Sequence, residues 1–104
     1  EQMSKTDIIL IEHICKHHQV QFSFINSLKE MGLLQVLVLE DGEYVQQHQL
    51  KDIEKMIRIH YELNINLEGI DVIFHLLNRI ENLELELLTV KNKLQAFDTE
   101  HDFI

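Results

Sequence analysis

The longest hydrophobic pattern in the chain lies in its last third, where large apolar residues recur at alternating steps of three and four. This spacing predicts a long helix over residues 67–98, with an apolar seam that pairs with a second helix. The seam residues are Ile73, Leu76, Ile80, Leu83, Leu87, Val90, Leu94 and Phe97. Leaving the seam in water would forfeit about 1.5–3 kcal/mol per large side chain. We therefore predict that these eight residues form the interface of a homodimer. The alternative is a helix that folds back on its own domain.

Two shorter helical patterns lie near the start of the chain, after a short apolar stretch at Ile8 and Ile9 that is typical of a strand. The first pattern covers residues 12–18 and the second residues 21–31, with a tight turn near Gln19. Gly32 stands where the left-handed residue that ends a helix is expected. Two short helices joined by a tight turn predict a helix-turn-helix.

An acidic turn separates two short apolar segments in the middle of the chain. Residues 35–39 are leucine- and valine-rich, and Tyr44 and Val45 follow the sequence Glu40-Asp-Gly-Glu43. Asp-Gly between two apolar segments predicts a β-hairpin. This hairpin would be a wing beside the two helices.

A third helix is predicted over residues 48–63. Its expected core stripe consists of Leu50, Ile53, Ile57 and His60, widened by Met56 and Leu63. Asn66 then suits the N-cap of the last helix, with Ile65 packing against Ile70. The predicted division is a winged helix-turn-helix region with its third helix over residues 1–66, a dimerisation helix over 67–98 and a loose tail over 99–104. Together these parts form one structural domain that is mainly α.

The composition limits which partners the chain can bind. Eighteen acidic residues against nine Lys and Arg leave a net charge of −9, and proline is absent from the 104 residues. This charge disfavours DNA as a partner, because phosphate binding depends on Lys and Arg, and it favours a basic partner or simply solubility. The longest nearly apolar run, residues 33–39, is too short to cross a membrane, and no signal-peptide pattern opens the chain. We expect a cytoplasmic protein.

Catalytic and metal-binding patterns are weak. The sequence shows no nucleophile–base pair and no glycine-rich phosphate loop, so no enzymatic activity and no cofactor are expected. His13 and His17 share a helix face near Cys15, but no acidic or cysteine partner stands at a recognised spacing, so no metal site is expected. His60 and His75 are expected to be partly buried helix residues. The single cysteine excludes an intrachain disulfide.

The order of these elements resembles the MerR-type winged helix-turn-helix with a small β-hairpin wing and a long C-terminal dimerisation helix. Residues 20–34 resemble that family's second helix and its Gly-Leu-Leu exit, and residues 60–70 resemble its link between helices. Two departures stand out. Residues 24–29 read Phe-Ile-Asn-Ser-Leu-Lys where the family has Thr-Leu-Arg-Tyr-Tyr-Glu. The wing carries Glu40, Asp41 and Glu43 where the family has arginines.

Within this fold the chain most resembles the chaperone modulatory proteins of the CbpM type. Residues 11–17 (Ile-Glu-His-Ile-Cys-Lys-His) resemble that family's Ile-Thr-Glu-Phe-Cys-Leu-His, and residues 58–70 resemble its Arg-Leu-Arg-His-Glu-Leu segment and the Gly-Ile that follows. The spacing continues through residues 78–83. This resemblance implies binding to the J-domain of a DnaJ-like (CbpA-type) co-chaperone and inhibition of its stimulation of the DnaK-type ATPase. It also implies an antiparallel dimer.

The wing is the predicted J-domain interface, through Glu40, Asp41, Glu43 and Tyr44. Its carboxylates would face the basic helix with which J-domains contact DnaK. The simpler alternative is a solvated loop tip with the tyrosine packed under the hairpin. Two other functions stay open: a MerR-like DNA-binding transcription regulator, and a plain dimerisation module with an unrelated basic partner.

Overall fold

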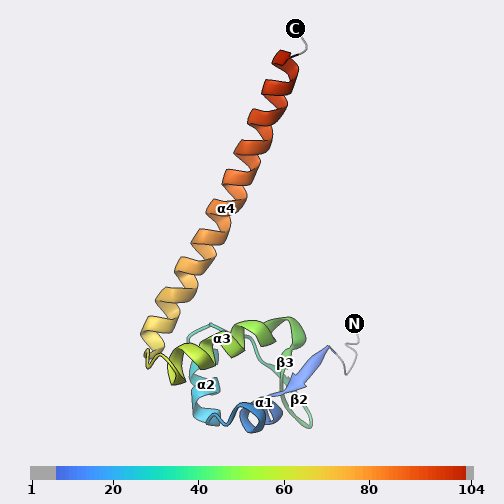
Figure 1. The fold of residues 1–104 in the computed structure, drawn as a ribbon. Coiled ribbons are helices and arrows are strands. Elements are labelled where there is room, and N and C mark those ends of the chain that lie inside the picture. Colours follow the sequence, from blue (N-terminus) through green and yellow to red (C-terminus); the bar gives the residue numbers. More distant parts are fainter. Residues whose placement is uncertain (1–6, 103–104) are drawn as a thin grey trace. The chain divides into compact units, whose positions relative to one another are not determined.

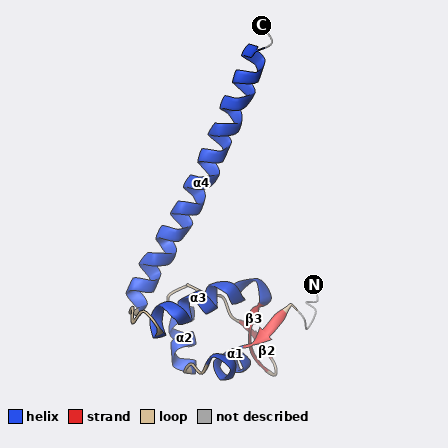
Figure 2. Cartoon of the chain, viewed as in Figure 1, coloured by secondary structure: helices blue, strands red, loops and turns tan. Residues whose placement is uncertain are grey.

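The computed structural model describes residues 7–102 and confirms a mainly helical chain with a small sheet (Figures 1 and 2). The chain divides into two compact units, the first ending at Asp71 and the second beginning at Val72. The elements in order are β1 (Ile8–Leu10), α1 (Ile11–His18), α2 (Phe22–Glu30), β2 (Leu37–Leu39), β3 (Gly42–Gln46), the short 3-10 helix η1 (Gln47–Gln49), α3 (Leu50–Tyr61) and α4 (Leu67–Asp102).

The turn between α1 and α2 has the tight geometry predicted for a helix-turn-helix. Gln19 adopts a left-handed conformation with φ of 56°. The next residue, Val20, donates its backbone N–H to the Cys15 carbonyl at 3.0 Å and is buried. Because a left-handed residue satisfies the last carbonyls of a helix, α1 ends here and the chain reverses into α2.

Helix α2 ends in the same way. Gly32 has a φ of +79°, and Leu33 donates its N–H to the Leu28 carbonyl at 2.9 Å. The prediction of a left-handed glycine at this position is confirmed. Glycine suits the site because this φ carries no steric cost without a Cβ.

The wing is part of a three-stranded antiparallel sheet in the order β1-β3-β2, at one side of the helices (Figure 2). Tyr44 pairs with Leu10 on one side and Leu37 on the other. The two turn residues are Glu40 and Asp41, so Gly42 begins β3 rather than lying in the turn as predicted. Gly42 has a φ of +149°, and a Cβ there would lie 3.0 Å from Leu10 Cδ1. The positive φ favours a glycine at this position, and a larger residue would also need the flexible end of the Leu10 side chain to move.

The core of the first unit combines residues from α1, α2, α3 and the start of α4 with one strand and two loop residues. Its buried apolar residues are Ile11, Ile14, Val20, Phe24, Ile25, Leu28, Leu34, Val45, Ile53, Met56, Ile57 and Ile70. Leu63, predicted to widen this core, is instead 62% exposed. The reason is that α3 ends at Tyr61 and Asn64 turns the chain with a φ of 58°, so the helical spacing no longer applies at Leu63.

The two histidines that were expected to be partly buried differ in their exposure to solvent. His60 is half-buried, stacks on Phe24 with ring centroids 4.6 Å apart, and donates its Nδ1–H to the Ile65 carbonyl at 2.9 Å. The prediction for His60 is confirmed. His75 is exposed, so the prediction for it was wrong.

Helix α4 begins with the predicted N-cap. The side-chain oxygen of Asn66 accepts a hydrogen bond from the Gly69 N–H at 2.8 Å. At the other end, α4 continues to Asp102, so the backbone of residues 99–102 is helical where a loose tail was expected. The remaining two tail residues, 103 and 104, lie outside the described residues.

The cap makes a testable contribution to stability. Asn66→Ala removes the acceptor and is expected to lower the free energy of unfolding by about 1 kcal/mol, measured by urea titration followed by circular dichroism. Asn66→Asp keeps an acceptor in the same place and is the control. Equal losses in both variants would show that the hydrogen bond to Gly69 does not stabilise the helix.

Candidate protein-binding surface

The outward side of α2 is the surface with which a helix-turn-helix reads DNA. Phe24, Ile25 and Leu28 face the core. The exposed residues of this helix are Phe22, Ser23, Lys29 and Glu30. This surface therefore presents one cation and one anion, with an exposed aromatic ring at its start.

The wing adds carboxylates beside this helix. Glu40 and Asp41 are exposed at the turn, and Glu43 follows on β3. Lys29 Nζ lies 3.9 Å from Glu43 Oε1, and both side chains remain about 40% accessible, so this pair adds little stability. The contact matters for the charge of this surface, because Lys29, the exposed cation of α2, lies next to a wing carboxylate.

Tyr44 lies on the same strand as Glu43 and is half-buried among its cross-strand neighbours. The Asp41 carboxylate raises the pKa of Tyr44 above its ordinary value, chiefly as an acceptor for the Tyr44 hydroxyl, and burial adds to the shift. The structure thus brings Asp41 and Tyr44 together at the wing turn. The contact of the four wing residues with a partner stays a prediction.

The Asp41–Tyr44 bond can be tested by pH titration. In a Tyr61→Phe background, Tyr44 is the remaining tyrosine, and its ultraviolet titration is expected to have its midpoint above 10.0. Any stabilisation from this bond is present below pH 10.0 and is lost as the pH rises through the raised pKa. Asp41→Asn should bring the midpoint down toward the ordinary value, and Glu40→Gln should not. A midpoint unaffected by Asp41→Asn would contradict the bond.

An open groove of about 410 Å³ runs between the start of α1, the start of α2 and the wing turn. We call it the α1–wing groove, and its lining residues are Leu10, Ile11, Glu12, Cys15, Phe22, Asp41, Gly42 and Glu43. Cys15 is half-buried here. Burial and then the nearby Glu12 raise the pKa of the Cys15 thiol. Glu12 and Phe22 were not predicted from the sequence as site residues. The only sequence feature that could have indicated Phe22 is that it is an aromatic residue outside the apolar stripe of its helix.

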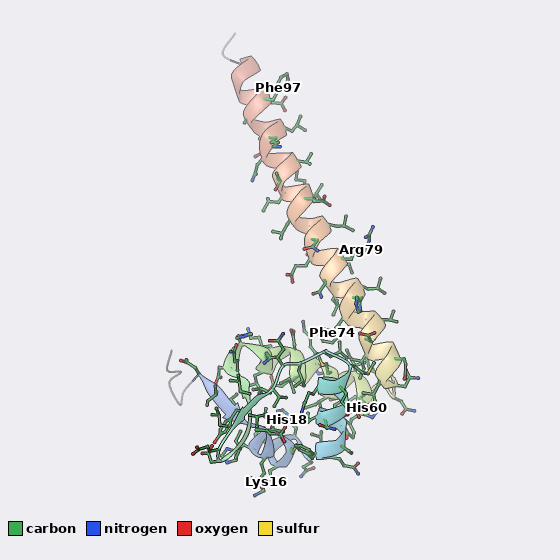
Figure 3. All side chains as sticks on the ribbon, turned by 180° about the vertical axis from the view of Figure 1, so that it is seen from behind. Lys16, His18, His60, Phe74, Arg79 and Phe97 are labelled. Carbon is green, nitrogen blue, oxygen red and sulfur yellow. The ribbon has the colours of Figure 1, made fainter. Side chains whose placement is uncertain are left out.

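A second hollow contains the histidines of α1, the helix that carries His18 and Lys16 in Figure 3. Its polar residues are His13, His17, His18 and Glu54, and His18 Nε2 lies 3.3 Å from Glu54 Oε2. Within residues 7–102, no three His, Cys, Asp or Glu side chains are arranged to hold a metal ion. The hollow contains a close contact between the His18 imidazole and the Glu54 carboxylate, which joins α1 to α3.

The predicted seam of α4 is open to solvent after its half-buried first residue, Ile73. Leu76, Ile80, Leu83, Leu87, Val90, Leu94 and Phe97 are each 50–60% exposed. Figure 3 shows side chains projecting from the length of this helix, with Arg79 and Phe97 labelled. No helix among the described residues is long and apolar enough to cross a membrane.

The helix-turn-helix, the three-stranded wing and the long last helix define a protein of the winged helix-turn-helix class. The family model described as MerR HTH family regulatory protein matches residues 9–92, so the chain belongs to this family. Proteins of this family are typically non-enzymatic regulators. No curated protein and no solved structure matches the chain significantly.

Proposed function

We propose that this protein is a non-enzymatic, dimeric regulator that binds the J-domain of a DnaJ-like co-chaperone in the cytoplasm and limits stimulation of a DnaK-type ATPase. The observation that carries the proposal is the charge of the surfaces that meet DNA in this fold. The exposed face of α2 and the wing together present Glu30, Glu40, Asp41 and Glu43 against Lys29. Phosphate binding requires the opposite balance, because affinity for DNA comes from neutralisation by Lys and Arg.

A basic protein surface fits the same charges. Carboxylates at the wing turn, on a chain of net charge −9, would attract a cationic helix and speed its association. The J-domain, which the sequence resemblance implies as partner, uses such a helix to contact DnaK. A regulator seated on that helix blocks the contact by occupying it, so inhibition needs no chemistry from the bound protein.

The test is direct binding followed by a functional assay. A purified J-domain is titrated into the full chain by calorimetry at low and moderate salt, and DnaK ATP hydrolysis is then measured with the co-chaperone and increasing amounts of this protein. We expect binding that weakens with salt and a dose-dependent loss of stimulated hydrolysis. Absence of binding, or binding with stimulation intact, would overturn the proposal.

DNA binding is the second candidate, since the family match covers the helix-turn-helix and the wing. It predicts a mobility shift of duplex DNA at low salt, with affinity falling steeply as salt rises. We expect no shift at micromolar protein. A tight, sequence-dependent shift would favour the DNA-binding regulator over the J-domain regulator.

A further inference from the structure

We propose that the α1–wing groove is the docking site for the partner, and that its occupant is a basic amphipathic helix. This inference rests on the proposed function, since the J-domain is the partner considered, and it deepens that function by assigning the site. It also adds residues outside the wing turn to the interface, namely Leu10, Glu12, Cys15 and Phe22.

The floor of the groove is apolar and built from separate elements. Leu10 comes from β1, Ile11 and Cys15 from α1, and Phe22 from the first residue of α2. The Phe22 side chain is 49% exposed. A large aromatic side chain that lines a hollow and is open to water is the kind of anchor that a partner's apolar residues cover.

The rim of the groove is acidic on two elements. Glu12 stands in the first turn of α1, while Asp41 and Glu43 stand on the wing. Among residues 7–102, neither Glu12 nor Asp41 lies within ion-pair distance of a cation, and Glu43 has only the long 3.9 Å contact with Lys29. These carboxylates are therefore available to a cationic ligand and repel an anionic one.

An apolar floor with charged rims matches one arrangement of side chains on a helix. A helix bound in a groove inserts apolar residues spaced three and four apart, and its long basic side chains extend to either side. Lys and Arg of such a helix would reach Glu12 on α1 and Asp41 or Glu43 on the wing. An acidic or phosphorylated segment would meet repulsion at the same positions.

The single cysteine provides a footprint of this site that needs no mutation. Cys15 is the only cysteine in the chain, and it lines the groove. The full chain is reacted with N-ethylmaleimide at pH 8.5, with and without a saturating J-domain whose own cysteines have been replaced. We expect the bound J-domain to slow the modification about tenfold or more, because it excludes the reagent from the groove. The urea-unfolded chain gives the rate for a fully accessible Cys15 thiol.

A pair of charge reversals tests the rim. Glu12→Lys changes the groove, and Asp52→Lys changes an exposed acidic residue in the first turn of α3, away from it. Both variants replace a first-turn carboxylate, so their effects on helix stability match. We expect Glu12→Lys to weaken J-domain binding about tenfold and Asp52→Lys to leave it within about twofold.

A truncation tests the apolar floor of the groove. Phe22→Ala should also weaken J-domain binding, with Leu63→Ala as its exposed apolar control.

The outcomes separate the two proposals. Failure of the wild-type chain to bind the J-domain overturns the proposed function and the site with it. Wild-type binding with an unprotected Cys15, or with equal affinities for Glu12→Lys and Asp52→Lys, overturns the groove and leaves the proposed function standing. Circular dichroism confirms that each variant is folded before its affinity is compared.

Discussion

Replacing Leu83 and Leu87 together with glutamate is expected to convert the proposed dimer to a monomer. Both leucines lie on the α4 seam and are 50% and 56% exposed in the single chain. At about 1.5 kcal/mol for each leucine, loss of the four in a dimer weakens association by about 6 kcal/mol, roughly 10⁴-fold. The four buried carboxylates that replace them oppose association further. Analytical ultracentrifugation over a range of protein concentrations measures the shift.

The control for this experiment lies on the same helix. Leu85 and Leu88 are exposed to 58% and 55% but stand off the heptad seam. Leu85→Glu with Leu88→Glu makes the same chemical change in the same segment and should leave the dimer intact. A monomeric wild-type chain, or equal dissociation by both pairs, would contradict the seam as the dimer interface.

Leu28→Ala is expected to produce the largest loss of stability from a single substitution. Leu28 lies near the end of α2 and is fully buried, so truncation removes apolar contacts and leaves a cavity. Such substitutions cost about 2–5 kcal/mol, a large fraction of the stability of a small domain. Urea unfolding of the full chain, followed by circular dichroism, measures this loss.

Leu63→Ala is the matched control, because the same truncation at a residue that is 62% exposed should change stability by less than about 0.5 kcal/mol. A comparable loss at Leu63 would mean that this residue packs in solution as the helical pattern predicted, and that α3 extends beyond Tyr61.

The proposed dimer would affect function as well as assembly. Each protomer carries its own α1–wing groove, and every residue of that groove lies within the first unit of one chain. A dimer therefore offers two equivalent sites, and a partner that is itself dimeric would gain affinity through avidity. The monomeric Leu83→Glu, Leu87→Glu variant should keep the affinity for an isolated J-domain while losing that gain.

The sequence by itself determined the features that depend on neighbouring residues. Helical periodicity located α1, α2, α3 and the long α4, because a helix repeats its environment every three or four positions. Gly32 and Asn66 marked helix ends correctly, because capping depends on the backbone and side chain of a few adjacent residues. The absence of arginine from the wing was likewise evident from the sequence.

The tertiary structure decided what depends on residues far apart in the chain. The pairing of Leu10 with Tyr44 joins β1 to the wing, and the Gln49 side-chain amide bonds both backbone groups of Gln35. No local pattern specifies such partners, since many apolar segments could pair equally well. The exposure of Leu63 and the half-burial of Cys15 follow from where helices end and what packs beside them. The α1–wing groove has the same origin, because its floor and rim come from four separate elements and exist only once the sheet forms.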